Sequence, residues 1–167
     1  KPDFAEYIGK LASAAGIEIK TFADVKEALA KRMEFFKENG CCISDHGLEY
    51  VMYVPAADEE IEAIFAKRMT GEPVSRNEEL AYKTAFMIYM GRKCNELDFG
   101  MQLHYGCKRD NNKLMYDRLG PDTGYDAIHD VNCAAAGHKL LNRLAMEDKL
   151  TKTILYNLNP KDNEVLA

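Results

Sequence analysis

The sequence predicts an α/β fold in which parallel strands alternate with helices, and three observations support this. Apolar residues occupy every second position of 99–103, as in a buried strand. A helical segment leads directly into a short apolar run at 41–43, which is the helix-to-strand half of a (β/α)8 repeat. A β-branched, apolar run at 153–158 predicts a third strand. Because a complete barrel needs at least about 200 residues, we expect 1–167 to form a single partial (β/α)8 TIM barrel domain with about three parallel strands.

The helices before the first strand are predicted by apolar residues at helical spacing and by the residues at their ends. From 2 to 15 the apolar residues recur on one face, and a glycine ends the run. Thr21 stands three residues before Asp24, a variant of the capping box, and opens a second amphipathic helix that ends at an Asn-Gly pair. The strand at 41–43 is expected to follow directly, with the polar residues 44–46 at its tip.

Two further helices separate the first predicted strand from the second. They are expected at about 58–69 and, after a capping box, at about 75–97. In a regular barrel the next strand comes about 30 residues later, whereas His104 lies 59 residues after Asp45. We therefore expect 48–74 to be a helical insertion over the mouth of the barrel, and the second helix to pack outside it.

The C-terminal third is predicted to contain a loop, a helix, the last strand and the start of another helix. Residues 120–124 are rich in glycine and aspartate and indicate a loop. The helix at 131–147 carries His138 on its apolar stripe, where packing is the expected role of that side chain. A final helix is expected to start at Asn159 and Pro160, after the last strand.

The candidate site residues lie where the predicted strands end. Residues 98–112, DFGMQLHYGCKRDNN, pass from an apolar strand into a loop that is too polar to be buried without partners. Because the carboxyl ends of neighbouring parallel strands open onto one face of a barrel, Asp45 and His104 are predicted to lie near one pocket. Arg109 has the fork geometry that binds a carboxylate through two hydrogen bonds.

The sequence pattern alone also allows each of these three residues a purely structural role, with no part in catalysis or ligand binding. Asp45 could cap a turn, and His104 could be a hydrogen-bonded histidine of the core. Arg109 could pair on the surface with Asp110 or Asp117, an interaction worth about 1 kcal/mol or less.

The loop after Arg109 carries further polar residues with more than one interpretation. Asp122, Asp126 and Asp130 fit a loop that folds over the site and a set of turn-forming acids equally well. His129 lies among them, where a solvated hydrogen-bonding role is expected. Cys107 has no base beside it in the sequence, so we assign it no nucleophilic role.

Composition excludes several classes of partner. The net charge is −5, and the 22 basic and 27 acidic residues are interspersed, so no basic stripe is available for nucleic acid. No apolar run approaches the roughly 18 residues needed to cross a bilayer, so no membrane partner is expected. The five cysteines lack CxxC spacing, which predicts reduced thiols and a cytoplasmic location.

Three separated motifs resemble those of one enzyme family. SDHG at 44–47, MQLHYG at 101–106 followed by Arg109 and an asparagine pair, and GPDTGYDAIHD at 120–130 resemble motifs of the uronate isomerases (glucuronate isomerases) of the amidohydrolase superfamily. The similarity continues to TILYNLNPKDNEVLA at 153–167 and spans essentially the whole chain. It corresponds to an interior portion of a longer enzyme, so we expect both ends of the chain to continue into that enzyme.

The resemblance implies an aldose-ketose isomerase that interconverts D-glucuronate and D-fructuronate, and D-galacturonate and D-tagaturonate. It implies catalytic roles for Asp45 and His104 and substrate binding by Arg109, because these positions match the family's motifs. It also implies a divalent metal, expected to be zinc, held by an H-x-H pair on the first barrel strand and an aspartate on the last. None of the four histidines has H-x-H spacing, so no metal ligand is assigned within this chain.

The chain by itself is therefore expected to be inactive, with its catalytic base and metal on strands that it lacks. Three parallel strands leave two open edges, so we also expect association with the missing barrel portion or a homo-oligomer. Two alternatives remain open. One is a metal-dependent hydrolase of the same superfamily, in which His104 would bind metal directly, and the other is a non-catalytic helical interaction module.

Overall fold

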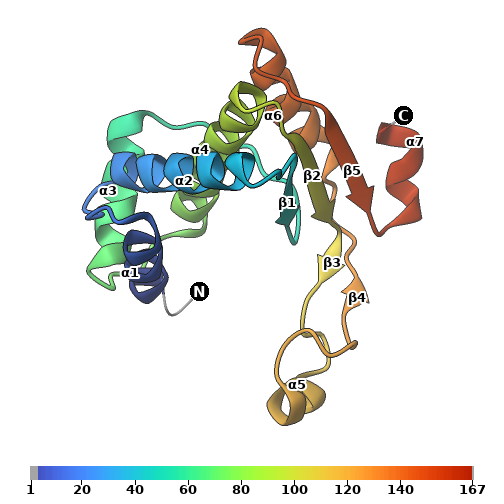
Figure 1. Cartoon of the computed structure of the whole chain (residues 1–167). Helices are drawn as coiled ribbons and strands as arrows, with labels where there is room; N and C mark the ends of the chain where they lie inside the picture. The colour runs from blue at the N-terminus through green and yellow to red at the C-terminus, as the bar shows by residue number, and fades with distance from the viewer. Residues whose placement is uncertain (1–3, 167) are drawn as a thin grey trace.

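A parallel three-stranded sheet lies at the centre of the computed structural model, which describes residues 4–166 (Figure 1). In chain order the elements are α1 Phe4–Ala15, α2 Phe22–Glu38, β1 Ile43–Gly47, α3 Asp58–Met69, α4 Arg76–Glu96, β2 Gly100–Tyr105, β3 Cys107–Lys108, α5 Lys113–Leu119, β4 Ala127–Ile128, α6 Ala134–Met146, β5 Thr153–Asn157, the 3-10 helix η1 Pro160–Asp162 and α7 Asn163–Leu166. β2 is the middle strand, and it pairs in parallel with β1 on one side and β5 on the other. The α/β class and the three parallel strands are thus confirmed.

Both predicted capping boxes are present. The hydroxyl of Thr21 accepts a hydrogen bond from the backbone N–H of Asp24, whose carboxylate accepts one from the N–H of Thr21. Ser75 and Glu78 make the same reciprocal pair at the start of α4. Each box satisfies backbone donors that the first turn of a helix leaves free, so these two helices begin where the sequence predicts.

One face of the sheet is packed against helices. Met101, Leu103 and Tyr105 occupy alternate positions of β2 and are buried in a core that α4 and α6 complete with Met87 and Leu140. These side chains point to one side because successive residues of a strand alternate between faces. The apolar alternation seen in the sequence therefore marks the helix-facing side of the sheet.

The opposite face carries exposed apolar groups. The strand registers place Ile43, Ile154 and Tyr156 on the same side as His104, and all three of those large side chains are exposed. Within residues 4–166 this face has no covering helix of the kind that α4 and α6 provide on the other side.

The N-terminal helices form a second core beside the sheet. α1, α2 and α3 pack together and against α4 around Ile8, Phe22, Phe65 and Ala81. Figure 1 shows these three helices to one side of the sheet. Residues 48–74, predicted as a helical insertion, contain the segment after β1 and helix α3 of this core. No helix within residues 4–166 has both the length and the apolar character needed to cross a bilayer.

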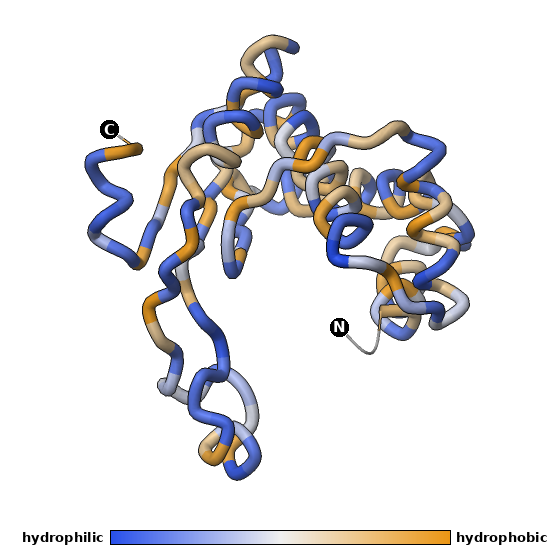
Figure 2. Tube along the Cα trace, turned by 180° about the vertical axis from the view of Figure 1, so that it is seen from behind, coloured by the Kyte–Doolittle hydropathy of each residue, from blue (hydrophilic) through white to orange (hydrophobic). Residues whose placement is uncertain are grey.

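An antiparallel ribbon of β3 and β4 extends away from the sheet and carries α5 at its end (Figures 1 and 2). The chain enters it at Gly106, whose φ of 84° favours glycine. Cys107 pairs with Ile128, and Lys108 pairs with Ala127. The polar loop predicted at the end of 98–112 is therefore wrong for Cys107 and Lys108, which form a short strand. A two-residue strand has no periodicity of its own, and its partner lies about 20 residues further along the chain.

Three element boundaries also differ from the prediction. The first strand is Ile43–Gly47 and not 41–43, so Asp45 lies within the strand and not beyond its tip. Parallel pairing with β2 satisfies the backbone of these polar residues, which no apolar pattern marks. Helix α6 begins at Ala134 and not at 131, and the last helix is preceded by the short 3-10 turn at Pro160.

The predicted packing of His138 was wrong, because its side chain is exposed. The buried residues of α6 are Ala134, Leu140 and Leu144, which follow helical spacing. His138 lies beside this stripe and not on it.

The close approach of α4 to α6 at Gly91 generates a prediction about stability. A Cβ atom at Gly91 would lie 2.5 Å from Cδ1 of Leu144, which is fully buried. We expect Gly91→Ala to cost about 1–3 kcal/mol through overpacking, only partly offset by the gain of up to about 1 kcal/mol in helix propensity. Urea denaturation followed by circular dichroism measures the free energy of unfolding.

Gly9→Ala is the matched control, because Gly9 lies within α1 and, apart from its chain neighbours and the backbone of α1 itself, no heavy atom of residues 4–166 comes within 4 Å of its Cβ position. This variant should be stabilised by up to about 1 kcal/mol. Equal destabilisation of both variants would contradict the packing explanation.

Candidate active site

Asp45 and His104 meet on the open face of the sheet. Oδ1 of Asp45 lies 2.9 Å from Nε2 of His104. The register pairs Gly47 with His104, and Asp45 points to the same side as Gly47 because the two are two residues apart on one strand. The side chain of Asp45 is 63% exposed and that of His104 is 47% exposed, so a ligand can reach both. The structure thus brings together two residues that are 59 positions apart in the sequence.

The contact joins one imidazole nitrogen of His104 to a carboxylate oxygen of Asp45. An ionised carboxylate has no proton to donate, so a hydrogen bond between these two atoms needs the proton on Nε2. The second ring nitrogen, Nδ1, takes no part in this contact.

Tyr156 extends this pair across the third strand. It is the register partner of His104, and the two rings stack with centroids 4.4 Å apart and planes 6° apart. Asp45, His104 and Tyr156 thus form a row over β1, β2 and β5. Tyr156 was not among the candidates predicted from the sequence, because a tyrosine in an apolar strand indicates neither the face on which it lies nor its register. The predicted strand at 153–158 was the only signal.

Arg109 directly follows β3 of the ribbon, and its side chain pairs with two acids. Its Nη1 donates to Asp122 at 3.0 Å and to Asp126 at 3.3 Å. Its Nη2 faces β1, since a Cβ atom built at Gly47 would lie 3.7 Å from it. The ribbon therefore places Arg109 beside the strand end that carries Asp45. The surface pairing considered from the sequence named other acids, and Asp117 in fact pairs with Lys113.

Asp126 connects several groups at the base of the ribbon. Its carboxylate accepts hydrogen bonds from the backbone N–H of Asp110 at 2.9 Å, from the thiol of Cys107 at 3.3 Å and from Arg109. These donors lower the pKa of Asp126, chiefly through the Asp110 backbone, so this acid stays ionised. Burial, and then Asp126, raise the pKa of Cys107, which argues against a thiolate nucleophile there.

The described residues do not provide a metal site. Within residues 4–166, no three His, Cys, Asp or Glu side chains lie close enough to hold an ion. Nε2 of His46 bonds to Ser44 at 2.9 Å, and burial lowers the pKa of this imidazole. His129, expected to be solvated, is only 23% exposed and lies 3.8 Å from Glu49. The residues that the structure describes therefore do not fit the implied divalent metal.

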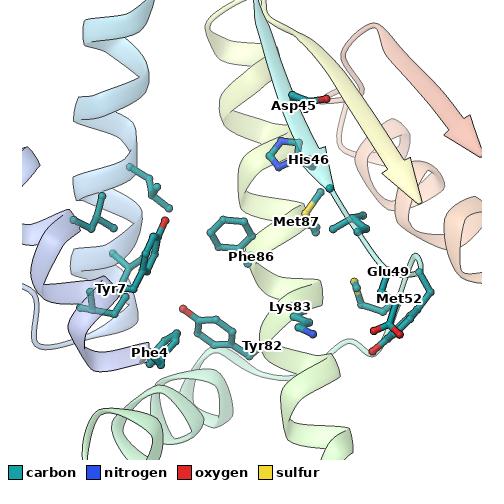
Figure 3. A pocket seen from close by; sticks show the side chains of 17 residues that line it. Phe4, Tyr7, Asp45, His46, Glu49, Met52, Tyr82, Lys83, Phe86 and Met87 are labelled. Atoms are coloured by element: carbon teal, nitrogen blue, oxygen red, sulfur yellow. The ribbon is translucent and has the colours of Figure 1, made fainter. Parts of the chain in front are cut away.

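A cavity of about 690 Å³ adjoins the pair between α1, α2, β1 and α4 (Figure 3). Its lining is mainly apolar and aromatic, and Phe86 projects into it from α4. The polar side chains of its lining include His46, Glu49 and Lys83. Asp45 also lines it. A small polar ligand needs hydrogen-bonding partners, so the open face with Asp45, not this cavity, is the better candidate site.

One family model and several curated proteins match this chain. A family model described as glucuronate isomerase matches residues 1–167. The uronate isomerase of Lachnoclostridium phytofermentans is 52% identical over 167 residues, which are 100% of this chain and 36% of that protein. The uronate isomerase of Lachnospira eligens is 48% identical with the same coverage. The chain thus spans about 36% of the length of these curated relatives.

A solved structure agrees with the sequence comparison. The crystal structure of uronate isomerase from Thermotoga maritima matches with a TM-score of 0.90 and 31% identity, covering 97% of this chain and 36% of that one. The glucuronate isomerase of Caulobacter crescentus has a TM-score of 0.84 at 24% identity, which supports the fold. The three strands and their helices are therefore an arrangement found within larger enzymes.

The stack of Tyr156 on His104 predicts a spectroscopic difference between two substitutions. Tyr156→Leu removes the aromatic ring, so the carbon-bound ring protons of His104 should lose their ring-current shift in ¹H–¹³C NMR spectra. Tyr156→Phe keeps the stacked ring and should preserve those resonances. Identical His104 resonances in the wild type and the leucine variant would show that the stack does not form in solution.

The environment of Cys107 predicts slow reaction with alkylating agents. Cys107 is buried and its thiol pKa is raised, whereas Cys42 is exposed. Because the thiolate is the nucleophile, iodoacetamide at neutral pH should modify Cys42 first. Peptide mass spectrometry over a time course measures both rates. Faster modification of Cys107 would restore it as a candidate nucleophile.

Proposed function

The chain belongs to the glucuronate isomerase family, whose model matches residues 1–167, and on this premise we propose that it supplies part of a uronate isomerase active site. The proposed reaction interconverts D-glucuronate and D-fructuronate, and D-galacturonate and D-tagaturonate. The observation that carries the proposal is the 2.9 Å pair of Asp45 and His104 at neighbouring parallel strands, with Arg109 beside the same strand end.

The proposed architecture is a partial (β/α)8 barrel formed by residues 1–167 as one domain. The packed face of the sheet would be the outer wall, because α4 and α6 cover it. The face with Ile43, Ile154 and Tyr156 would line the barrel interior, which accounts for exposed apolar groups that strands outside this chain would cover. Residues 48–74 would then be an insertion at the barrel mouth.

The proposed reaction moves a proton between the first two carbons of the sugar through an enediol-like intermediate. His104 would hydrogen bond to a substrate oxygen through Nδ1 and support the charge that develops there. Asp45, whose Oδ1 lies 2.9 Å from Nε2, would orient His104 or a substrate hydroxyl. Arg109 would bind the substrate carboxylate or an oxyanion through the donors on Nη2.

The proton-abstracting base and the divalent metal, proposed to be zinc, would come from residues outside this chain. The described residues do not fit a metal, so no part of the proposed roles of Asp45, His104 and Arg109 depends on one. Completion of the barrel would require association with the rest of the enzyme, and the open sheet face also suits homo-oligomer formation. A cytoplasmic location stays a prediction.

The geometry favours this proposal over the two alternatives. Direct metal binding by His104 in a hydrolase would need further ligands, and within residues 4–166 no three His, Cys, Asp or Glu side chains lie close enough to hold an ion. A non-catalytic module would bury His104 and pair Arg109 far from any cleft, whereas His104 is about half exposed and Arg109 adjoins Gly47, which lines the cavity.

A chimera tests the proposal. In it, this chain replaces the matching residues of the Lachnoclostridium phytofermentans uronate isomerase, and ketose formation from D-glucuronate is followed spectroscopically. We expect the chimera to be active and His104→Ala to lower kcat by about a hundredfold or more, the usual scale for a group that transfers or polarises a proton. The isolated chain should not turn over substrate.

His138→Ala is the matched control, because this histidine is exposed on α6 away from the sheet face. It should keep full activity. Equal activity of the two alanine variants would refute the role of His104, and robust turnover by the isolated chain would refute the assignment of base and metal to other residues.

A further inference from the structure

Building on the proposed function, we propose that Gly47 is a specificity-determining residue, and that its missing side chain leaves the space for the carboxylate end of the sugar acid between Arg109 and His104. Gly47 would thereby decide which ligands fit at this end of β1, whereas Asp45 and His104 would have the catalytic roles.

The position of Gly47 places it among the three candidate residues. It ends β1, shares a face with Asp45 and is the register partner of His104. Neighbouring strands lie about 4.8 Å apart, so a side chain at Gly47 would be next to the base of the His104 side chain. On its other side, Nη2 of Arg109 would lie 3.7 Å from the Cβ atom.

The space above Gly47 is open. Apart from its chain neighbours, Nη2 of Arg109 is the only heavy atom of residues 4–166 within 4 Å of the Cβ position. Arg109, His104 and Asp45 therefore flank a position on β1 that carries no side chain. A group entering it would meet the donors of Arg109 first.

The backbone does not explain why this residue is glycine. Gly47 is not among the residues with positive φ, in contrast to Gly106 at 84°. An ordinary side chain is therefore compatible with the strand, and glycine in a strand is destabilising relative to alanine. Glycine at such a position typically marks the close approach of a ligand or of another backbone.

The charges around Arg109 identify the kind of group that fits. Asp122 and Asp126 both hydrogen bond to Nη1, and their two negative charges exceed the single positive charge of the guanidinium. A ligand therefore gains from direct hydrogen bonds to Nη2 and not from attraction at long range. A carboxylate is the ligand group of a sugar acid that accepts such bonds most strongly.

Two alanine substitutions in the chimera test this inference. We expect Gly47→Ala to raise the Kd for D-glucuronate, measured by titration calorimetry, by about tenfold or more, because one methyl group in a fitted site has this scale of effect. Gly100→Ala is the control. Gly100 lies on the same sheet face at the opposite end of the strands, its nearest contact is also at 3.7 Å, and its φ is not positive. Its Kd should stay within about twofold of the parent.

The outcomes separate this inference from the proposed function. An unchanged Kd in Gly47→Ala, or an equal loss in both variants, would overturn the specificity role of Gly47. A folded parent chimera that binds D-glucuronate without converting it would refute the isomerase proposal, and the Kd comparison would still decide on Gly47. A folded parent that does not bind D-glucuronate would refute both.

Discussion

The parallel register between β1 and β2 is the constraint on which the candidate site depends. Backbone hydrogen bonds at both ends of the pair hold it, from the N–H of Gly100 to the carbonyl of Cys42 at 2.8 Å and from the N–H of Leu48 to the carbonyl of His104 at 2.7 Å. A shift of one residue would turn every side chain of β1 to the opposite face. Asp45 would then point towards α4, and its bond to His104 would be lost.

The uneven cover of the sheet explains why the polar groups lie where they do. The buried side chains of β2, Met101 and Leu103, anchor it to α4 and α6, so the face with His104 is the one left for chemistry. Burial of an acid and an imidazole against apolar helices would cost free energy that few local partners could offset. On the open face both groups pair with each other and remain accessible to a ligand.

The ribbon places the positively charged Arg109 beside the end of β1, and contacts within the ribbon segment hold it there. Asp126 accepts hydrogen bonds from the Asp110 backbone, from Cys107 and from Arg109, and so ties the end of β3 to the segment before β4. With Asp122 on the same nitrogen, the guanidinium is restrained from two directions. Such preorganisation limits the rotamer entropy that Arg109 would otherwise lose on binding a ligand.

The sequence by itself determined the α/β class, the two capping boxes and the three strands. Capping, as at Thr21, and apolar alternation, as at Leu103, are local properties, so they can be recognised without knowing which residues are neighbours in space. It also indicated Asp45 and His104 as neighbours, since parallel strands present their carboxyl ends on one side. Only the tertiary structure decided the strand ends, the stack of Tyr156, the acids that hold Arg109 and the empty space over Gly47. These features depend on registers and on pairings between distant residues, such as Cys107 with Ile128. A single sequence carries no periodic signal for such contacts.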